Sequence, residues 1–133
     1  MRFIRLPVIV AFLLAAILPG VAAGEVMLSF NLRKADGTQA VYEFRVPSVL
    51  PAQPFVESVQ AQHEAGVAAL NWAKGFYQAH EVFLTSVVFK ANPIPYYLAT
   101  FDGSVGGMRQ PFFAVVLGGN AVLEPVELQV VPR

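Results

Sequence analysis

Two histidines are the side chains best suited to proton transfer near neutral pH in this sequence. His63 and His80 stand seventeen positions apart, and each is followed directly by a glutamate, Glu64 and Glu81. Free imidazole titrates near pH 6.5, so histidine is the residue type best suited to general-base catalysis. On a helix, neighbouring side chains point about 100° apart, so a His-Glu pair cannot share one metal ion unless a loop brings it together. We therefore interpret both histidines as solvated residues at a helix edge and predict no metal site.

A serine triad could be assembled only from residues that are far apart in the chain. Ser86 or Ser104 would be the nucleophile, either histidine the base, and Asp36 or Asp102 the orienting carboxylate. No G-x-S-x-G segment places a serine on a sharp strand-to-helix turn. No cysteine is present to supply a thiolate in place of the serine. The sequence therefore does not predict nucleophilic catalysis.

Scattered carboxylates and a glycine-rich segment are the remaining chemical signals. Glycoside hydrolysis needs two carboxylates that flank the substrate, and a domain this small offers little cleft for a sugar. The candidate carboxylates are Glu81, Asp102, Glu124 and Glu127. Gly103, Gly106 and Gly107 match neither the dinucleotide-binding pattern nor the lysine-bearing phosphate loop. We predict no catalytic residue, no cofactor and a hairpin loop over residues 104–110, so the protein is not expected to be an enzyme.

The composition is that of one small apolar domain. The chain has 133 residues, of which 56% are hydrophobic and 14% are charged, and it has no cysteine. This length fits one domain, the low charge excludes disorder of the whole chain, and the lack of cysteine excludes a disulfide framework. Nine basic residues balance nine acidic ones and form no cluster, so no nucleic-acid partner is expected.

The N-terminal segment has the three parts of a secretory signal peptide. Arg2 and Arg5 precede an uninterrupted apolar run over residues 6–18, and Ala22-Ala23 supplies small residues for cleavage. As a helix this run is about 20 Å long, shorter than the ~30 Å hydrocarbon layer that an uncleaved membrane anchor, the alternative, must cross. We predict a signal peptide at residues 1–23 and a single domain at residues 24–133. The domain is expected to be secreted, extracellular or periplasmic, and not bound to a membrane.

Strand patterns and turn signals alternate over most of the remaining chain. Residues 39–46 alternate apolar and polar side chains, and the turn at Asp36-Gly37 joins them to residues 26–32 as a hairpin. Three prolines over residues 47–54 exclude a helix or a central strand and indicate a loop. A second turn is predicted at Asp102-Gly103. Further strands are predicted at residues 82–89, 96–101, 112–117 and 122–131, the last interrupted by Pro125.

Residues 55–77 contain the one convincing helical pattern. Apolar side chains recur there at spacings of three and four, which places them on one face of a helix. Gly66 lowers the helix propensity and is a point where the helix could divide, and Gly75 is a candidate for its end. We predict an α+β fold: a mostly antiparallel sheet of five or six strands with one main helix packed on one face.

Three segments carry a resemblance to a known family. Residues 66–73 (GVAALNWA) look like the family's helix, residues 96–103 (YYLATFDG) like a strand running into a turn, and residues 111–119 (PFFAVVLGG) like a later aromatic strand. Together they resemble the transcobalamin-like C-terminal domain, the small β-rich domain of cobalamin carriers and related secreted proteins. Phe113 stands where that family usually has tryptophan, and the chain has no counterpart of the helical domain that completes the carriers' corrinoid site. The resemblance implies the fold and a binding role, with weak corrinoid affinity unless a partner covers the ligand.

The aromatic residues indicate how such a module could bind. Side chains of successive strand residues point to opposite faces, so one ring of Tyr96-Tyr97 and one of Phe112-Phe113 should point away from the helix. Such rings are either covered by a second layer or form an exposed patch that marks a ligand or partner site. By the resemblance, the ligand-facing candidates are Tyr97, Phe101, Phe112 and Phe113, with Gly103 and Gly107 in the loop at the rim.

These observations predict a secreted, non-catalytic binding module. Its ligand would be a corrinoid or another small apolar or aromatic molecule, or its partner another protein. The alternative is an extracellular structural or matrix protein that assembles through exposed aromatic strands. The two classes differ in self-association, because only the second requires copies of the chain to pair.

Overall fold

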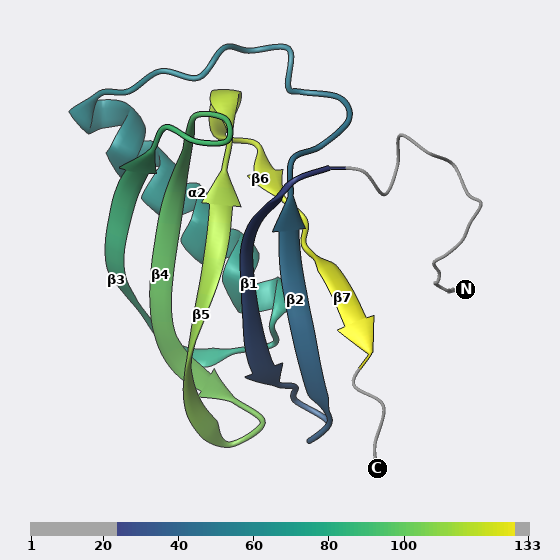
Figure 1. Ribbon diagram of the computed structural model, residues 1–133. Coiled ribbons are helices and arrows are strands. Elements are labelled where there is room, and N and C mark those ends of the chain that lie inside the picture. The colour runs from purple at the N-terminus through teal and green to yellow at the C-terminus, as the bar shows by residue number, and fades with distance from the viewer. Residues whose placement is uncertain (1–23, 130–133) are drawn as a thin grey trace. The chain divides into compact units, whose positions relative to one another are not determined.

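The computed structural model describes residues 24–129 of the chain (Figure 1). The predicted signal peptide, residues 1–23, lies outside this range, as do residues 130–131 of the last predicted strand. Within residues 24–129, no helix is both long enough and apolar enough to cross a membrane.

The described residues belong to two compact units. One contains Gly24, Glu25 and Val46–Leu50, and in it the Val46 N–H donates a hydrogen bond to the Glu25 carbonyl at 2.9 Å. The other contains Val26–Arg45 and residues 51–129. All the helices and strands described below belong to this second unit.

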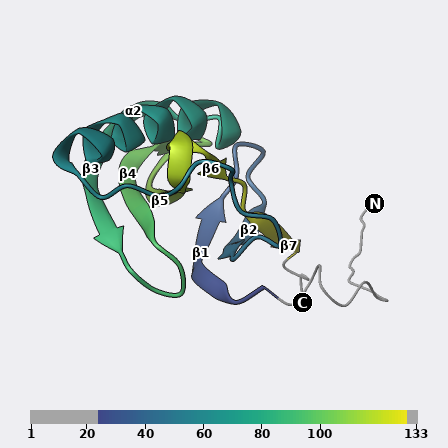
Figure 2. The same ribbon diagram turned by 90° about the horizontal axis from the view of Figure 1, so that it is seen from above.

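Two antiparallel sheets and one long helix form the second unit within its described residues. β1, β2 and β7 make a three-stranded sheet in the order β1-β2-β7, and β3 to β6 make a four-stranded sheet in chain order. The two sheets form a half-barrel, and α2 packs on one face of the four-stranded sheet (Figures 1 and 2). The elements are β1 (Val26–Arg33), β2 (Gln39–Arg45), α2 (Val59–Phe76), β3 (His80–Lys90), β4 (Tyr96–Val105), β5 (Met108–Val116), the short 3-10 helix η1 (Gly118–Asn120), β6 (Val122–Leu123) and β7 (Val126–Gln129).

The predicted α+β class is confirmed, with the strands divided between two sheets instead of one. The segment predicted as a single last strand is two strands, β6 and β7, which lie in different sheets. Pro125 stands between them, and its missing N–H prevents one continuous ladder. The described residues therefore contain seven strands where five or six were predicted.

The helix begins where its first backbone N–H groups gain a cap. Ser58 has an extended backbone, and its Oγ accepts a hydrogen bond from the Ala61 N–H at 3.0 Å. The helix therefore begins at Val59, four residues later than predicted, and it continues without a break to Phe76.

Small residues on the inner side of α2 let the helix lie close to the sheet. Gly66 does not divide the helix. Its lack of a side chain serves packing, since a Cβ there would lie 3.1 Å from Leu84 Cδ2 and 3.3 Å from Val87 Cγ2. Gly75 does not end the helix either. The other buried residues of this face are Ala65, Ala69 and Ala73.

The hairpin between β4 and β5 corrects the sequence prediction. Asp102-Gly103 is not a turn, and residues 104–110 are not a loop, because β4 continues to Val105 and β5 begins at Met108. The turn is Gly106-Gly107, with φ of +60° and +76°. Two successive residues at positive φ give a tight hairpin turn whose twist matches that of the strands. The adjacent glycines, rather than the Asp-Gly pair, therefore set the position of the turn.

Tyr77, directly after α2, is at the centre of the core. Its side chain is 3% exposed, and its hydroxyl donates to the Phe113 carbonyl of β5 at 2.7 Å. The ring also contacts both sheets and the helix, with centroid separations between 4.9 and 6.1 Å. The neighbouring rings are those of Phe30, Tyr42, Trp72, Phe76 and Phe112.

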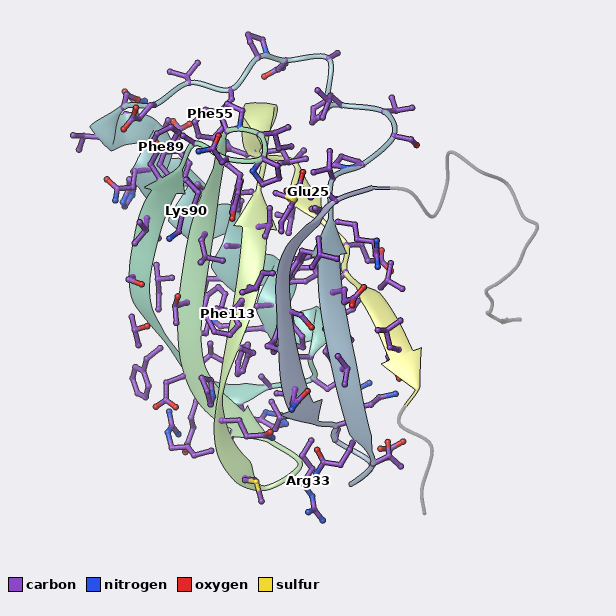
Figure 3. All side chains as sticks on the ribbon, viewed as in Figure 1. Glu25, Arg33, Phe55, Phe89, Lys90 and Phe113 are labelled. Carbon is purple, nitrogen blue, oxygen red and sulfur yellow. The ribbon has the colours of Figure 1, made fainter. Side chains whose placement is uncertain are left out.

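A side-chain amide joins the two sheets where β1 lies beside β5. Gln110 Oε1 accepts from the Arg33 N–H at 2.8 Å, and Gln110 Nε2 donates to the Arg33 carbonyl at 2.9 Å. The amide thus makes the pair of bonds that a strand residue would make. Nearby, the rings of Phe113 and Phe30 meet edge to face at 5.0 Å, and Figure 3 shows Phe113 on β5 close to β1.

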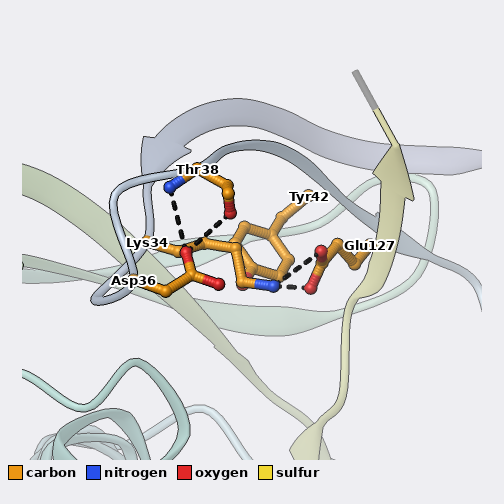
Figure 4. Close-up of polar contacts among 5 residues, drawn as sticks. All are labelled: Lys34, Asp36, Thr38, Tyr42 and Glu127. Atoms are coloured by element: carbon orange, nitrogen blue, oxygen red, sulfur yellow. Dashed lines mark hydrogen bonds and ion pairs between the residues drawn. The ribbon is translucent and has the colours of Figure 1, made fainter. Parts of the chain in front are cut away.

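A polar cluster at the outer edge of the three-stranded sheet has a structural role (Figure 4). Lys34 Nζ pairs with Glu127 Oε2 at 2.9 Å, and the Tyr42 hydroxyl donates to Glu127 Oε1 at 3.4 Å. Burial, together with the charge of Glu127, raises the pKa of Tyr42, so this phenol stays protonated and acts as a donor. Asp36 accepts bonds from the Thr38 hydroxyl and N–H, which lower the Asp36 pKa and close the β1–β2 turn.

Replacing either turn glycine with alanine tests the docking of the β4–β5 hairpin. Both have positive φ, so each substitution costs about 1–2 kcal/mol of backbone strain. A Cβ at Gly106 would also lie 2.7 Å from the Lys34 carbonyl oxygen, whereas at Gly107 nothing lies within 4 Å. We expect Gly106→Ala to lower the free energy of unfolding by about 1–3 kcal/mol more than Gly107→Ala, measured by urea denaturation. Equal losses would show that the hairpin does not dock on the β1–β2 turn.

Tyr77→Phe tests the central hydrogen bond. The variant keeps the ring contacts but loses the hydrogen bond to the Phe113 carbonyl. The free energy of unfolding at neutral pH should therefore fall by about 1–2 kcal/mol. Burial raises the pKa of Tyr77, whereas an unfolded tyrosine titrates near pH 10. Stability from the neutral phenol is therefore complete below pH 10 and is lost as the pH rises further. The alkaline decline in stability should be shallower in Tyr77→Phe than in the natural chain, and an unchanged slope would contradict this role.

Candidate functional site

The structure divides the four predicted ligand-facing rings between two faces of the sheet. Tyr97, Phe101 and Phe112 face α2 and are at most 3% exposed. Phe113 and Tyr96 face the other way, as the alternation of the strands predicts. On that side Phe113 is half-buried against Phe30 of β1, so a second layer covers part of this face. Because three rings lie under the helix and Phe113 lies on the opposite face, the four rings do not form one surface.

The two predicted rim glycines also lie apart. Gly103 is a buried residue of β4, and a Cβ there would be 3.0 Å from the Phe112 ring and 3.1 Å from Val82. Gly107 is exposed in the tight turn between β4 and β5. Gly103 therefore makes room for core side chains, and only Gly107 lies at the surface.

Tyr97 does line a cavity, at the end of the sheet where α2 begins. The cavity has a volume of about 200 Å³ and is partly open to solvent. Its walls come from the loop before α2, the first turns of α2, the start of β4 and η1. The lining residues are Gln53, Pro54, Phe55, Val56, Ala61, Glu64, Tyr97, Leu117, Gly118, Gly119 and Asn120. We refer to this space as the Tyr97 cavity.

Hydrogen bonds from Tyr97 hold the loop and the helix start in place. Its hydroxyl accepts from the Ser58 N–H and donates to the Ser58 carbonyl, both at 3.1 Å. The Phe55 ring lies 5.0 Å from the Tyr97 ring and 5.6 Å from the Phe89 ring, and Figure 3 shows Phe55 and Phe89 near the start of α2. These aromatic contacts form a fixed apolar floor for the cavity.

Two glycines allow the opposite wall to approach the loop. A Cβ on Gly118 would overlap the Gln53 carbonyl oxygen and lie 2.7 Å from the Pro54 carbonyl carbon. Gly119 has φ of +69°, and a Cβ there would lie 2.8 Å from Gln53 Oε1. Any larger residue at either position would push η1 and the loop apart, so the shape of the cavity depends on both glycines.

The polar groups around the cavity set the chemistry that it can offer. Glu64 is the one carboxylate among the described lining residues, and no lysine, arginine or histidine lines the cavity in that set. Gln60 Nε2 donates to Glu64 Oε2 at 3.1 Å, which leaves the other carboxylate oxygen available. Gln53 and Asn120 add amide donors and acceptors. The site therefore suits a neutral or cationic hydrogen-bonding molecule better than an anion.

The predicted chemical residues stay apart from this cavity. His63 and His80 are both exposed, and neither lines it. Among residues 24–129, no group of three histidine or carboxylate side chains is close enough to hold a metal ion. Asp102 and Glu81 both meet Arg109, at 3.0 and 3.6 Å, so these carboxylates form surface ion pairs.

Most of the cavity lies in segments that the sequence identifies only as connections. The prolines of residues 47–54 and the glycines after β5 predict a loop and a turn, but neither pattern predicts that these two segments meet. Tyr97 is the one predicted site residue that the structure brings to the cavity.

Comparisons with known proteins add no relative. The chain matches no known family, no curated protein and no solved structure. The resemblance to the transcobalamin-like C-terminal domain therefore rests on the quoted segments alone.

Tyr97→Phe tests whether the Tyr97 hydroxyl holds the cavity wall. The loss of the part-buried bond to the Ser58 N–H should cost about 1 kcal/mol and speed amide exchange in the first turn of α2. Tyr96→Phe is the matched control, because the adjacent tyrosine is equally buried but faces away from the cavity. Hydrogen exchange followed by NMR makes the comparison, and equal protection of the first turn in both variants would contradict the proposed role.

Proposed function

We propose that the protein is an exported, non-catalytic binding module that holds a small ligand in the Tyr97 cavity. The observation that carries this proposal is the cavity of about 200 Å³, with an aromatic floor and polar groups at its edge. Small-molecule sites are usually mostly apolar with a few convergent polar groups, whereas the larger part of this lining surface is polar, so a ligand would be held mainly by hydrogen bonds. Export rests on the predicted signal peptide at residues 1–23.

The size of the cavity favours a small ligand. Sites for drug-sized molecules usually have volumes of about 300–1,000 Å³, and this one is below that range. A single ring with one polar substituent fits such a space, with the ring against the exposed part of Phe55 and the substituent near Glu64 or Asn120. A corrinoid is far larger, so the ligand implied by the resemblance would need a partner chain to cover it.

The residues around the cavity support binding without catalysis. A general base must lie within hydrogen-bond distance of the proton that it takes, and both histidines lie outside the cavity lining. Glu64 is exposed to solvent at the rim, where a carboxylate can attract a cation. The Tyr97 hydroxyl is already bonded to Ser58 on both its donor and acceptor sides.

Three probes of equal size and different charge test this proposal: benzylammonium, benzyl alcohol and benzoate. In ¹⁵N NMR titrations, the first two should shift the amide signals of Gly118, Gly119 and Asn120, with benzylammonium binding most tightly. Glu64→Gln should remove the preference for benzylammonium over benzyl alcohol, because the rim carboxylate is then neutral. Benzoate should bind at least several-fold more weakly than benzylammonium to the natural chain.

Filling the cavity provides the control. Ala61→Phe places a ring in the space and should abolish the amide shifts, whereas Val67→Phe adds the same ring at an exposed helix position outside the lining. Circular dichroism confirms that both variants are folded. Equal binding by the two variants, or shifts that avoid the lining residues, would overturn the proposal.

A further inference from the structure

β3 is an unpaired edge of the four-stranded sheet. The strand has 11 residues and pairs only with β4 among the described strands. Its apolar side chains remain unusually open: Phe83 is 63% exposed, Val88 is 45% exposed and Leu84 is 39% exposed. Long apolar edge strands are ready sites for pairing with another strand.

β3 has two shifts in its register with β4, one between His80 and Phe83 and one between Leu84 and Ser86, and the second gives residues 82–89 a symmetric arrangement of faces. Leu84 pairs with Phe101 and Ser86 with Thr100, so Thr85 is an extra residue, and its hydroxyl donates to the Thr100 carbonyl at 3.0 Å. Because of this extra residue, Leu84 and Val87 both face α2, although they are three positions apart. Without the bulge, residues separated by an odd number of positions would lie on opposite faces.

Residues farther along β3 are also arranged in pairs about the Thr85–Ser86 bond, and the two members of each pair face the same side of the sheet. Val82 and Phe89 both face α2: Val82 lies against Gly103, and Phe89 packs on Phe55 and Tyr97. Phe83 and Val88 both face away from the helix, because their partners Asp102 and Leu98 alternate with helix-facing residues of β4. Each of these pairs is equidistant from the Thr85–Ser86 bond.

The charges at the two ends complete the pattern. Glu81 and Lys90 are also equidistant from the Thr85–Ser86 bond, and both side chains are exposed. Glu81 lies in the first register shift with positive φ and pairs with Arg109 at 3.6 Å, so the lysine of a second copy would share its carboxylate with Arg109. In an antiparallel pair of β3 strands centred on that bond, Glu81 of one copy would lie opposite Lys90 of the other, twice by symmetry. Every intervening apolar residue would then lie opposite an apolar residue, and Thr85 would lie opposite Ser86.

We propose that β3 pairs with β3 of a second copy of this chain, antiparallel and centred on Thr85 and Ser86. The charge complementarity of Glu81 with Lys90 and the matched faces on both sides of the bulge select this occupant and this register. The interface uses no residue of the Tyr97 cavity, so the two proposals can fail separately. Figure 3 shows Lys90 at the end of β3.

Gln62 of α2 competes with this pairing at one point. Its Nε2 donates to the Val87 carbonyl at 2.5 Å, and a second copy would need to replace that bond on the strand edge. Gln62→Ala should therefore strengthen the dimer, which is not expected if the copies associate only through exposed apolar side chains.

Single-cysteine variants test the register directly, because the natural chain has no cysteine. Phe83 of one copy would face Val88 of the other, so an oxidised mixture of Phe83→Cys and Val88→Cys chains should form the mixed disulfide dimer. Each variant alone should form little dimer, since its own cysteines would be separated by five residues, on the order of 17 Å, and a disulfide needs Cα atoms within about 7 Å. Mass spectrometry identifies the linked pair. Cross-linking that is equal in all three samples, or absent from the mixture, would overturn the proposal.

A charge exchange tests the same dimer without cysteine. Sedimentation of the chain should show a concentration-dependent dimer, about tenfold weaker in Lys90→Glu because two like-charged pairs then face each other. The double variant Glu81→Lys/Lys90→Glu should recover most of the loss. A monomer at all concentrations, or a double variant weaker than Lys90→Glu, would contradict the proposed pairing.

Discussion

The position of Tyr77 is the constraint on which the rest of the fold depends. Its ring contacts β1, β2, β5 and the end of α2, and its hydroxyl bonds to the Phe113 carbonyl. The chain must turn sharply after it, and both Gln78 and Glu81 have positive φ. Such conformations cost free energy and persist only where the surrounding structure holds them. The burial of Tyr77 therefore fixes the end of the helix and the two sheets at the same point.

Glycines at close contacts fix the two ends of the four-stranded sheet. Gly106 lets the β4–β5 hairpin reach the backbone of Lys34, and Gly118 lets η1 reach the backbone of Gln53. Both contacts join segments that are distant in sequence, and both would be blocked by a Cβ. The positions of the hairpin and of the cavity wall therefore both depend on a glycine that has no side chain where two backbones meet.

The sequence predicts those parts of the fold that depend on local periodicity. The alternation of residues 39–46 predicts β2, and the three- and four-residue spacing predicts α2, because each element buries one face. The prediction of a turn at Asp102-Gly103 is wrong because Gly103 is needed in β4 to accommodate the Phe112 ring. No local pattern distinguishes a glycine required by packing from one required by a turn. The sequence therefore predicts a turn at Gly103 and offers Gly66 as a point where the helix could divide, and neither feature forms.

The candidate site is harder to predict for the same reason. Tyr97 stands in a recognisable strand, but the segments that face it are loops whose meeting depends on tertiary contacts. The helix side of the sheet is closed, because alanines and Gly66 bring α2 down onto it. A site on the helix side of the sheet is thus confined to its margins, where a backbone edge or a connection remains accessible.

The two proposed surfaces meet at one aromatic cluster. Phe55 lines the Tyr97 cavity and packs with a tilted ring on Phe89, which is the neighbour of Lys90 at the end of β3. A ligand on Phe55 therefore contacts a ring that packs directly against the edge strand. Coupling between the sites would require the ligand to favour one position of that ring over another, because a ligand with equal affinity for both shifts nothing. The close packing of Phe55 between Tyr97 and Phe89 favours a single position, so the two proposed sites would share a wall and bind independently.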